Sequence, residues 1–140
     1  MSMIVSKQIE LLSDGRFNVM NITDQVINFV HGSGVQNGQA LVFFQHTTGA
    51  VILGEHETGI IADLEDMFER IIPTDYPFKH HIRTVDFNGH AHLRAALMPT
   101  SVTIPVIQGE LALGTYQEIL VIDDQIDQEP RYLILQVMGE

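Results

Sequence analysis

The sequence contains no cysteine and no tryptophan among its 140 residues. Without cysteine the chain can form neither a disulfide framework nor a thiolate metal site. Positive charge is also scarce, because 7 Lys and Arg residues stand against 18 Asp and Glu residues, which gives a formal net charge of −11. So acidic a surface repels phosphate backbones and anionic lipid headgroups. We therefore expect neither nucleic acid nor a membrane as a partner.

Long apolar stretches are absent as well. No apolar run approaches the roughly 20 residues that a membrane helix needs, and residues 1–7 lack the basic region and apolar stretch of a signal peptide. A cytoplasmic location is the resulting expectation. The chain has 45% hydrophobic and 18% charged residues, an ordinary balance for a globular protein. Because no linker, repeat or low-complexity segment interrupts it, we expect residues 1–140 to form a single domain.

Hydrophobic periodicity indicates a mixture of strands and helices. Short apolar runs predict strands over residues 4–12, 17–20, 39–46, 50–53, 101–106 and 131–138, with one or two more within 111–122. Helical spacing predicts a helix that Thr23 caps and Gly32 and Gly34 end, a longer helix over 59–71 and a short one over 92–98. Residues 74–90 are expected to form a long loop. About seven short strands and two main helices predict an α+β fold with a mainly antiparallel sheet.

The predicted strand over residues 39–46 is apolar on both faces. One face carries Ala40, Val42, Phe44 and His46, and the other carries Leu41 and Phe43. We therefore expect both faces of this strand to be covered.

Two acidic residues precede the predicted helix over residues 59–71. Thr58 can cap this helix, and the carboxylate of Glu57 also suits a capping role at the positive end of the helix dipole. Glu55 lies further from the helix start, where it could act as a general base or orient an imidazole.

The seven histidines are the most informative part of the composition. Four of them, His80, His81, His90 and His92, lie between residues 80 and 92. Neutral imidazoles are good zinc ligands, and three of them plus water make a catalytic type of site. None of the spacings is a recognised local zinc motif, so a metal site and solvated loop histidines both remain open. His90 and His92 would face the same side of an extended segment.

A second polar group follows the end of the strand over residues 39–46. His46 is followed by Thr47, Thr48 and Gly49, which can present several polar groups to a pocket. The alternative is a buried histidine that hydrogen-bonds to a neighbouring backbone carbonyl. Residues 114–117, with Thr115 and Gln117, could likewise place a hydroxyl and an amide beside a ligand, or form a bulge.

These residues belong to a longer series of motifs that occur in a fixed order. The series comprises His46 to Val51, Glu55, Asp63-Leu64, Pro73, His81, Asn88 to Leu93, Ser101 to Val106, Gly109, Leu113 to Gln117 and Pro130-Arg131. It resembles the signature of the YjbQ-like family, also called the secondary thiamine-phosphate synthase family, over nearly the whole chain. The sequence departs from the family at Pro99, Tyr116 and Leu133, where glycine, tryptophan and a second basic residue are usual.

The resemblance implies a homotrimeric α+β fold with a site lined by three histidines that can hold a metal ion. Carried over by motif, the metal ligands are His46, His81 and His92. The implied cofactor is a divalent metal ion, with zinc as the expected ion. The family is named for a weak thiamine-phosphate synthase activity, which joins a pyrimidine pyrophosphate to a thiazole phosphate.

The resulting hypothesis is a metal-dependent enzyme that acts on a phosphorylated small molecule. The expected ligand-binding residues are Thr47, Thr48, Asn88, Thr115 and Gln117, and the expected catalytic residue is Glu55, which would handle a proton. Two alternatives remain open. One is a metal-dependent binding or regulatory homotrimer without turnover, and the other is a structural trimer whose histidines pack at subunit boundaries.

Overall fold

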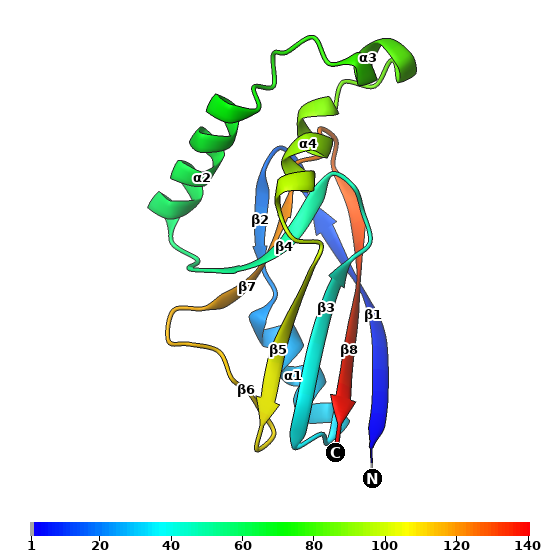
Figure 1. Ribbon diagram of the computed structural model, residues 1–140, viewed down its shortest axis with the longest axis vertical. Coiled ribbons are helices and arrows are strands. Elements are labelled where there is room, and N and C mark those ends of the chain that lie inside the picture. Colours follow the sequence, from blue (N-terminus) through cyan, green and yellow to red (C-terminus); the bar gives the residue numbers. More distant parts are fainter. Residues whose placement is uncertain (1) are drawn as a thin grey trace.

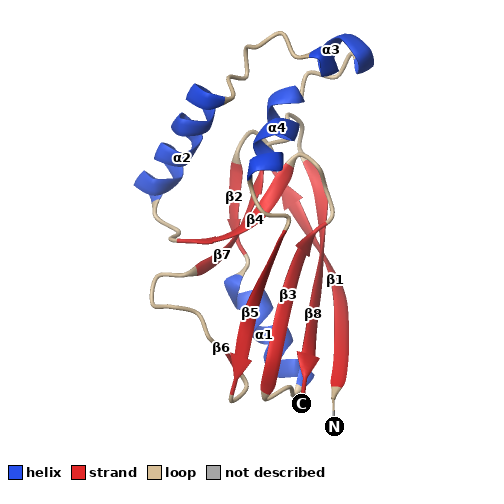
Figure 2. Cartoon of the chain, viewed as in Figure 1, coloured by secondary structure: helices blue, strands red, loops and turns tan. Residues whose placement is uncertain are grey.

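Two antiparallel sheets form the body of the protein in a computed structural model that describes residues 2–140 (Figures 1 and 2). The larger sheet has the strand order β1 (Met3–Ser13), β8 (Glu129–Gly139), β3 (Asn37–Phe44), β5 (Ser101–Ile107) and β6 (Glu110–Leu111). The smaller sheet has the order β2 (Asn18–Asn21), β7 (Glu118–Asp123) and β4 (Gly49–Gly54). The predicted α+β class with mainly antiparallel pairing is therefore confirmed.

Four helices complete the fold. They are α1 (Thr23–Ser33), α2 (Thr58–Ile71), α3 (Lys79–Thr84) and α4 (Gly89–Leu97). Figure 1 shows α2, α3 and α4 gathered at the end of the molecule that is opposite the two chain termini. Over residues 2–140, no helix has the length and apolar character needed to cross a membrane.

The main core lies between the inner faces of the two sheets and α1. Its members alternate along the strands, as the period of two in a strand requires. The buried residues include Ala40, Val42 and Phe44 of β3, Leu133, Leu135 and Val137 of β8, Ile119 and Val121 of β7, and Val26 and Val30 of α1. A second, smaller cluster joins Phe68 of α2 to Phe17 and Ile122. Leu64, near the middle of α2, packs against the same cluster.

The outer face of β3 is open in the single chain. Phe43 is 42% exposed and lies in register with Ile134 of β8, and Leu41 is only half-buried. The prediction that both faces of this strand are covered is therefore wrong for one chain. The inner face alone supplies the packing.

At α1 the predicted cap is wrong, and at α2 the structure selects one of the two predicted caps. Thr23 does not cap α1: it is the first helical residue, and its hydroxyl donates to Asn21 Oδ1 at 2.6 Å. At α2, the carboxylate of Glu57 accepts hydrogen bonds from the backbone N–H groups of Gly59 and Ile60. Glu57 is therefore the cap, as its position at the positive end of the helix dipole allows, and Thr58 is not.

The segment predicted as a long loop contains a helix. α3 lies inside residues 74–90, and α4 begins at Gly89 rather than at His92. α3 buries none of its residues, so it has no apolar stripe from which it could be predicted. Gly89 explains how the two helices come together, because a Cβ there would lie 2.8 Å from Phe78 Cγ and 2.9 Å from His81 Nε2.

Candidate functional site

The turn between β3 and β4 is held by a buried arginine. Arg131 of β8 is 4% exposed, and its guanidinium donates to Asp123 Oδ2 at 3.0 Å and to Thr48 Oγ1 at 3.1 Å. The same guanidinium stands 3.1 Å from His46 Nδ1. These charge-assisted contacts fix the residues that follow β3, including the exposed Thr47.

His46 is surrounded by hydrogen-bond donors. Its Nε2 accepts from the backbone N–H of Tyr132 at 2.9 Å, while its Nδ1 faces Arg131. A neutral imidazole has only one accepting nitrogen, so both contacts cannot be full hydrogen bonds at the same time. Burial first, and then the charge of Arg131, lower the pKa of His46 below its usual value. The ring is therefore neutral at pH 7.

His80 and His92 form a pair between α3 and α4, with their ring centroids 4.8 Å apart. His80 Nε2 donates to Asn88 Oδ1 at 2.9 Å, and the buried Asn88 is itself oriented by donating to Gln125 at 3.0 Å. His92 hydrogen-bonds to the backbone carbonyl of Thr47. Each ring thus donates one N–H to an oxygen, which leaves a lone pair on the other nitrogen of a neutral ring.

Burial also controls the charge of the histidines on α4. It lowers the pKa of His92, and the neighbouring His80 lowers it further. Burial and then Arg94 lower the pKa of His90 in the same way. These rings are neutral at pH 7, which is the form that binds a metal ion.

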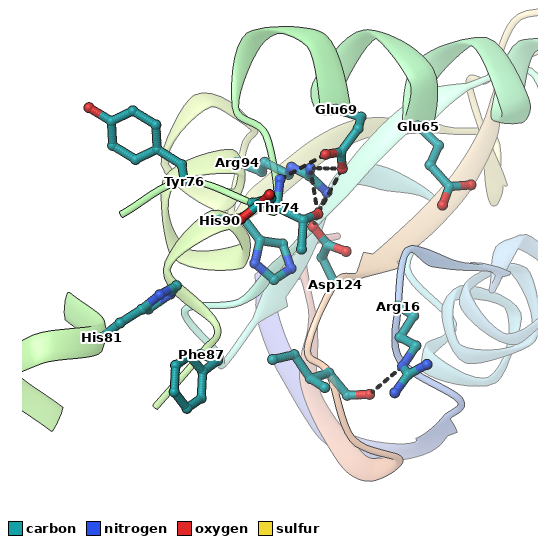
Figure 3. Close-up of a pocket in the computed structure, with 12 residues that line it drawn as sticks. Arg16, Glu65, Glu69, Thr74, Tyr76, His81, Phe87, His90, Arg94 and Asp124 are labelled. Carbon is teal, nitrogen blue, oxygen red and sulfur yellow. Dashed lines mark hydrogen bonds and ion pairs between the residues drawn. The ribbon is translucent and has the colours of Figure 1, made fainter. Parts of the chain in front are cut away.

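The three predicted metal ligands fall into two places. His46 and His92 line one pocket together with Thr47. His81 instead lines a cavity of about 580 Å³, shown in Figure 3, and its Nε2 accepts from the N–H of Gly89 at 3.1 Å. Over residues 2–140, no three His, Asp or Glu side chains are grouped so that they could hold a metal ion. The chain brings His80, rather than His81, into ring contact with His92.

Of the remaining predicted residues, Glu55, Thr115 and Gln117 lie apart from the pair of histidines, whereas Asn88 contacts His80 directly. Glu55 is exposed, and its side chain has no hydrogen bond or ion pair within the described residues. Thr115 is exposed, and Gln117 Oε1 accepts from the N–H of Gly114 at 2.8 Å. Both lie in the connection between β6 and β7, away from α3 and α4 in Figure 1. Thr48 and Asn88 are buried and hold neighbouring side chains.

Sequence reasoning left three important residues without a structural role. His80 had no assigned function, and the buried carboxylates Asp123 and Asp124 were not singled out. A signal was available for the acids, because two adjacent Asp residues end an apolar strand in a chain with only 7 Lys and Arg residues. Such acids are buried only when they are paired, here with Arg131 and Arg94.

Comparison with known proteins agrees with this fold and its motifs. Residues 7–140 match the family model described as UPF0047 protein YjbQ-like. A UPF0047 protein of Methanothermobacter thermautotrophicus is 35% identical over 116 residues, which cover 83% of this chain and 80% of that protein. A UPF0047 protein of Archaeoglobus fulgidus is 37% identical over 116 residues, covering 83% and 88% of the two chains.

Solved structures give the same result. The crystal structure of a YbjQ-like protein of unknown function from Sulfolobus solfataricus superposes with a TM-score of 0.94, at 30% identity and with both chains fully covered. A hypothetical protein from Aeropyrum pernix gives a TM-score of 0.90 at 31% identity and covers 97% of this chain and 99% of that one. The chain therefore belongs to the YjbQ-like UPF0047 family.

Proposed function

We propose that this protein is a metal-dependent enzyme that acts on a phosphorylated small molecule beside His80 and His92. The observation that carries the proposal is the arrangement of this pair. Each ring is anchored through one nitrogen by an oxygen acceptor, at Asn88 Oδ1 and at the Thr47 carbonyl. Metal-binding histidines are typically oriented in this way by the hydrogen bond of their second nitrogen.

Imidazole nitrogens suit divalent ions such as zinc, which is the first candidate, and in the single chain two of them, on His80 and His92, are in ring contact. His80 and His92 would supply two ligands. His46 lines the same pocket as His92 and is the third candidate, provided that its ring turns away from the N–H of Tyr132. When bound, the ion would supply an electrophile for phosphate oxygens in an otherwise acidic protein.

The other residues of the pocket would bind and orient the substrate. The exposed Thr47 can donate its hydroxyl to a phosphate oxygen, whereas Thr48 is 4% exposed and its hydroxyl oxygen holds Arg131. Arg131 would act by fixing the turn that carries His46 and Thr47 rather than by touching the substrate.

The reaction to test first is the one for which the family is named. In it the ring nitrogen of a thiazole phosphate forms a bond to the exocyclic carbon of a pyrimidine pyrophosphate. The carbon–oxygen bond breaks, and pyrophosphate leaves with the electron pair. Glu55 lies apart from the histidine pair in the single chain, so its predicted role of exchanging a proton with the leaving group would require a site completed by a neighbouring copy of the chain.

A second copy of the chain is the proposed cover for the open face of the larger sheet. This face carries Phe43, Ile134 and Met138, and the helix α2 also exposes Met67 and Ile71. An apolar face on both sides of β3 is expected of a strand that is buried on both sides. We propose a homotrimer in the cytoplasm, and in that assembly Thr115 and Gln117 could serve the site of a neighbouring copy.

The test is to measure the zinc content of the purified protein together with the variants His80→Ala and His92→Ala. His31→Ala is the matched control, because His31 is an exposed histidine on α1 whose ring, within residues 2–140, pairs with Glu110 alone. We expect about one zinc ion per chain in the parent and the control. In a zinc titration, each site variant should bind zinc at least tenfold more weakly than the parent. Equal zinc binding in all four proteins would overturn the site.

One observation favours a binding or regulatory protein without turnover as the second candidate. No carboxylate is hydrogen-bonded to His80 or His92 within the described residues. Incubation of the zinc-loaded protein with both phosphorylated substrates separates the two cases. Formation of thiamine phosphate that His92→Ala abolishes supports the enzyme, and saturable binding without product supports the second candidate.

A further inference from the structure

The two neighbouring histidines of α3 have different kinds of hydrogen-bond partner. His81 Nε2 accepts from the backbone N–H of Gly89 at 3.1 Å. A backbone N–H can only donate, so the proton of a neutral His81 ring lies on Nδ1. His80 Nε2 instead lies 2.9 Å from the side-chain amide oxygen of Asn88. A side-chain amide has one accepting and one donating end, so the position of the proton on His80 depends on which end of Asn88 faces it.

The orientation of Asn88 depends in turn on Gln125. Asn88 is 4% exposed, and its Nδ2 donates to Oε1 of Gln125 at 3.0 Å. Without an acceptor at residue 125, this orientation would leave a buried N–H group unpaired, which is unfavourable. The acceptor on Gln125 therefore keeps Oδ1 of Asn88 toward His80. A neutral His80 ring is then protonated on Nε2 and has its lone pair on Nδ1.

Gln125 is held by an unusual turn between β1 and β2. Three successive residues of this turn, Gly15, Arg16 and Phe17, have left-handed backbones, with φ of 72°, 56° and 63°. This conformation is unfavourable for Arg and Phe, and it persists only where the surrounding structure enforces it. Here the backbone N–H of Arg16 donates to the carbonyl of Gln125 at 2.7 Å, and a Cβ on Gly15 would collide with the same carbonyl. The turn therefore fixes the backbone from which the side chain of Gln125 reaches Asn88.

We propose that Gln125 is a positioning residue that sets the tautomer of His80 through Asn88. Two hydrogen bonds, from Asn88 to Gln125 and from His80 to Asn88, carry this effect to the ring. A metal ion binds the unprotonated nitrogen of an imidazole, so this tautomer assigns Nδ1 of His80 to the ion. The assignment to the ion rests on the proposed function, whereas the tautomer is a property of the metal-free chain.

Two substitutions of Gln125 separate the two orientations of Asn88. Gln125→Glu can only accept from Asn88, so it should keep His80 protonated on Nε2. Gln125→Lys can only donate, so Asn88 should reverse its amide and donate Nδ2 to His80 Nε2, which moves the proton of His80 to Nδ1. Gln128→Lys is the matched control, because Gln128 is an exposed residue of the same connection between β7 and β8 and its side chain contacts Asp14 instead.

The experiment is nitrogen NMR of the full chain after removal of metal ions, because protonated and unprotonated ring nitrogens give separate signals. Spectra are recorded at about pH 8, where an imidazole of ordinary pKa is neutral. In Gln125→Lys, we expect the ratio of Nδ1-protonated to Nε2-protonated His80 to rise at least tenfold over the parent. Gln125→Glu and the control should match the parent, and His81 should stay protonated on Nδ1 in all four proteins. His80 protonated on Nδ1 in the parent, or on Nε2 in Gln125→Lys, would overturn the proposal.

A zinc titration of the same four proteins tests the assignment of Nδ1 to the ion. Gln125→Lys should bind zinc at least tenfold more weakly than Gln125→Glu and the control. Equal zinc affinity in all four proteins would overturn this assignment. If the parent binds no zinc, the proposed function fails, but the tautomers of the metal-free chain still decide whether Gln125 positions His80.

Discussion

Replacement of Arg94 by methionine should destabilise the protein more than any change on its surface. Arg94 of α4 is 3% exposed and connects three parts of the chain. Its guanidinium donates to Asp124 at 2.9 Å, to Glu69 of α2 at 2.8 Å and to the carbonyl of Ile72 at 2.7 Å. Arg94 therefore holds the C-terminal end of α2 against α4 and closes one wall of the cavity.

The size of the destabilisation depends on the two carboxylates that lose their partner when Arg94 is replaced. Asp124 is 3% exposed, and removing one partner of a buried ion pair costs about 3–5 kcal/mol because the other charge remains buried and unpaired. Glu69 is half-exposed, so its share is only about 0.5–1 kcal/mol. We expect a loss of about 3–5 kcal/mol in the free energy of unfolding at pH 7. Adding Asp124→Asn to Arg94→Met should recover about 1–3 kcal/mol of unfolding free energy, because the unpaired buried carboxylate is then removed.

Urea unfolding followed by circular dichroism measures both values. Burial already raises the pKa of Asp124, and the loss of Arg94 should raise it further. A carboxyl with a raised pKa in the folded state favours folding at low pH and loses this advantage as the pH rises through that pKa. The defect of Arg94→Met should therefore be smaller at pH 4 than at pH 7. A loss below about 1 kcal/mol at pH 7, or a double variant no more stable than Arg94→Met, would refute the reasoning.

Two further predictions concern the same end of the molecule. Hydrogen bonds from the side chain and backbone of Thr74, and then Arg94, lower the pKa of Glu69 to about 2. Because a depressed pKa stabilises the fold above the unfolded value and this effect is lost as the pH falls through the folded value, Glu69→Gln should cost about 1 kcal/mol at pH 7 and little near pH 2. Urea unfolding at several pH values checks this, and an equal cost at both ends of the range would contradict it. Gly89→Ala should push α3 off α4 and separate His80 from His92 at a cost of about 1–3 kcal/mol, because the new Cβ would meet Phe78 and His81. Hydrogen exchange of residues 79–84 measures this against Gly32→Ala, which meets nothing within 4 Å, and equal protection in both variants would rule out the close approach.

The sequence was sufficient for the parts of the fold that bury a face. The alternation in β8 and the helical stripe of α2 follow from which side chains must leave water, so both elements lie within one or two residues of their predicted bounds. The α+β class followed from the same patterns. Whether the outer face of β3 is covered could not be predicted for one chain, because the pattern of apolar residues does not say which molecule provides the cover.

The choice between adjacent histidines depends on helix geometry that the sequence does not reveal. His80 and His81 are neighbours in the chain, but in a helix their side chains point roughly 100° apart. Because α3 is helical, His80 meets His92 and His81 faces Phe87. In a loop either residue could have faced α4. None of the residues of α3 is buried, so the sequence has no apolar stripe from which this helix could be predicted.

The same reasoning explains why α4 lines two pockets rather than one. In an extended segment His90 and His92 would share a side, and all four histidines between residues 80 and 92 would be candidates for a single cluster. Because α4 begins at Gly89, the two side chains leave the helix in nearly opposite directions. One side meets an imidazole and the Thr47 carbonyl, and the other meets carboxylates, Arg94 and aromatic rings. The start of one short helix thus places the His80–His92 pair and the cavity on different sides of α4.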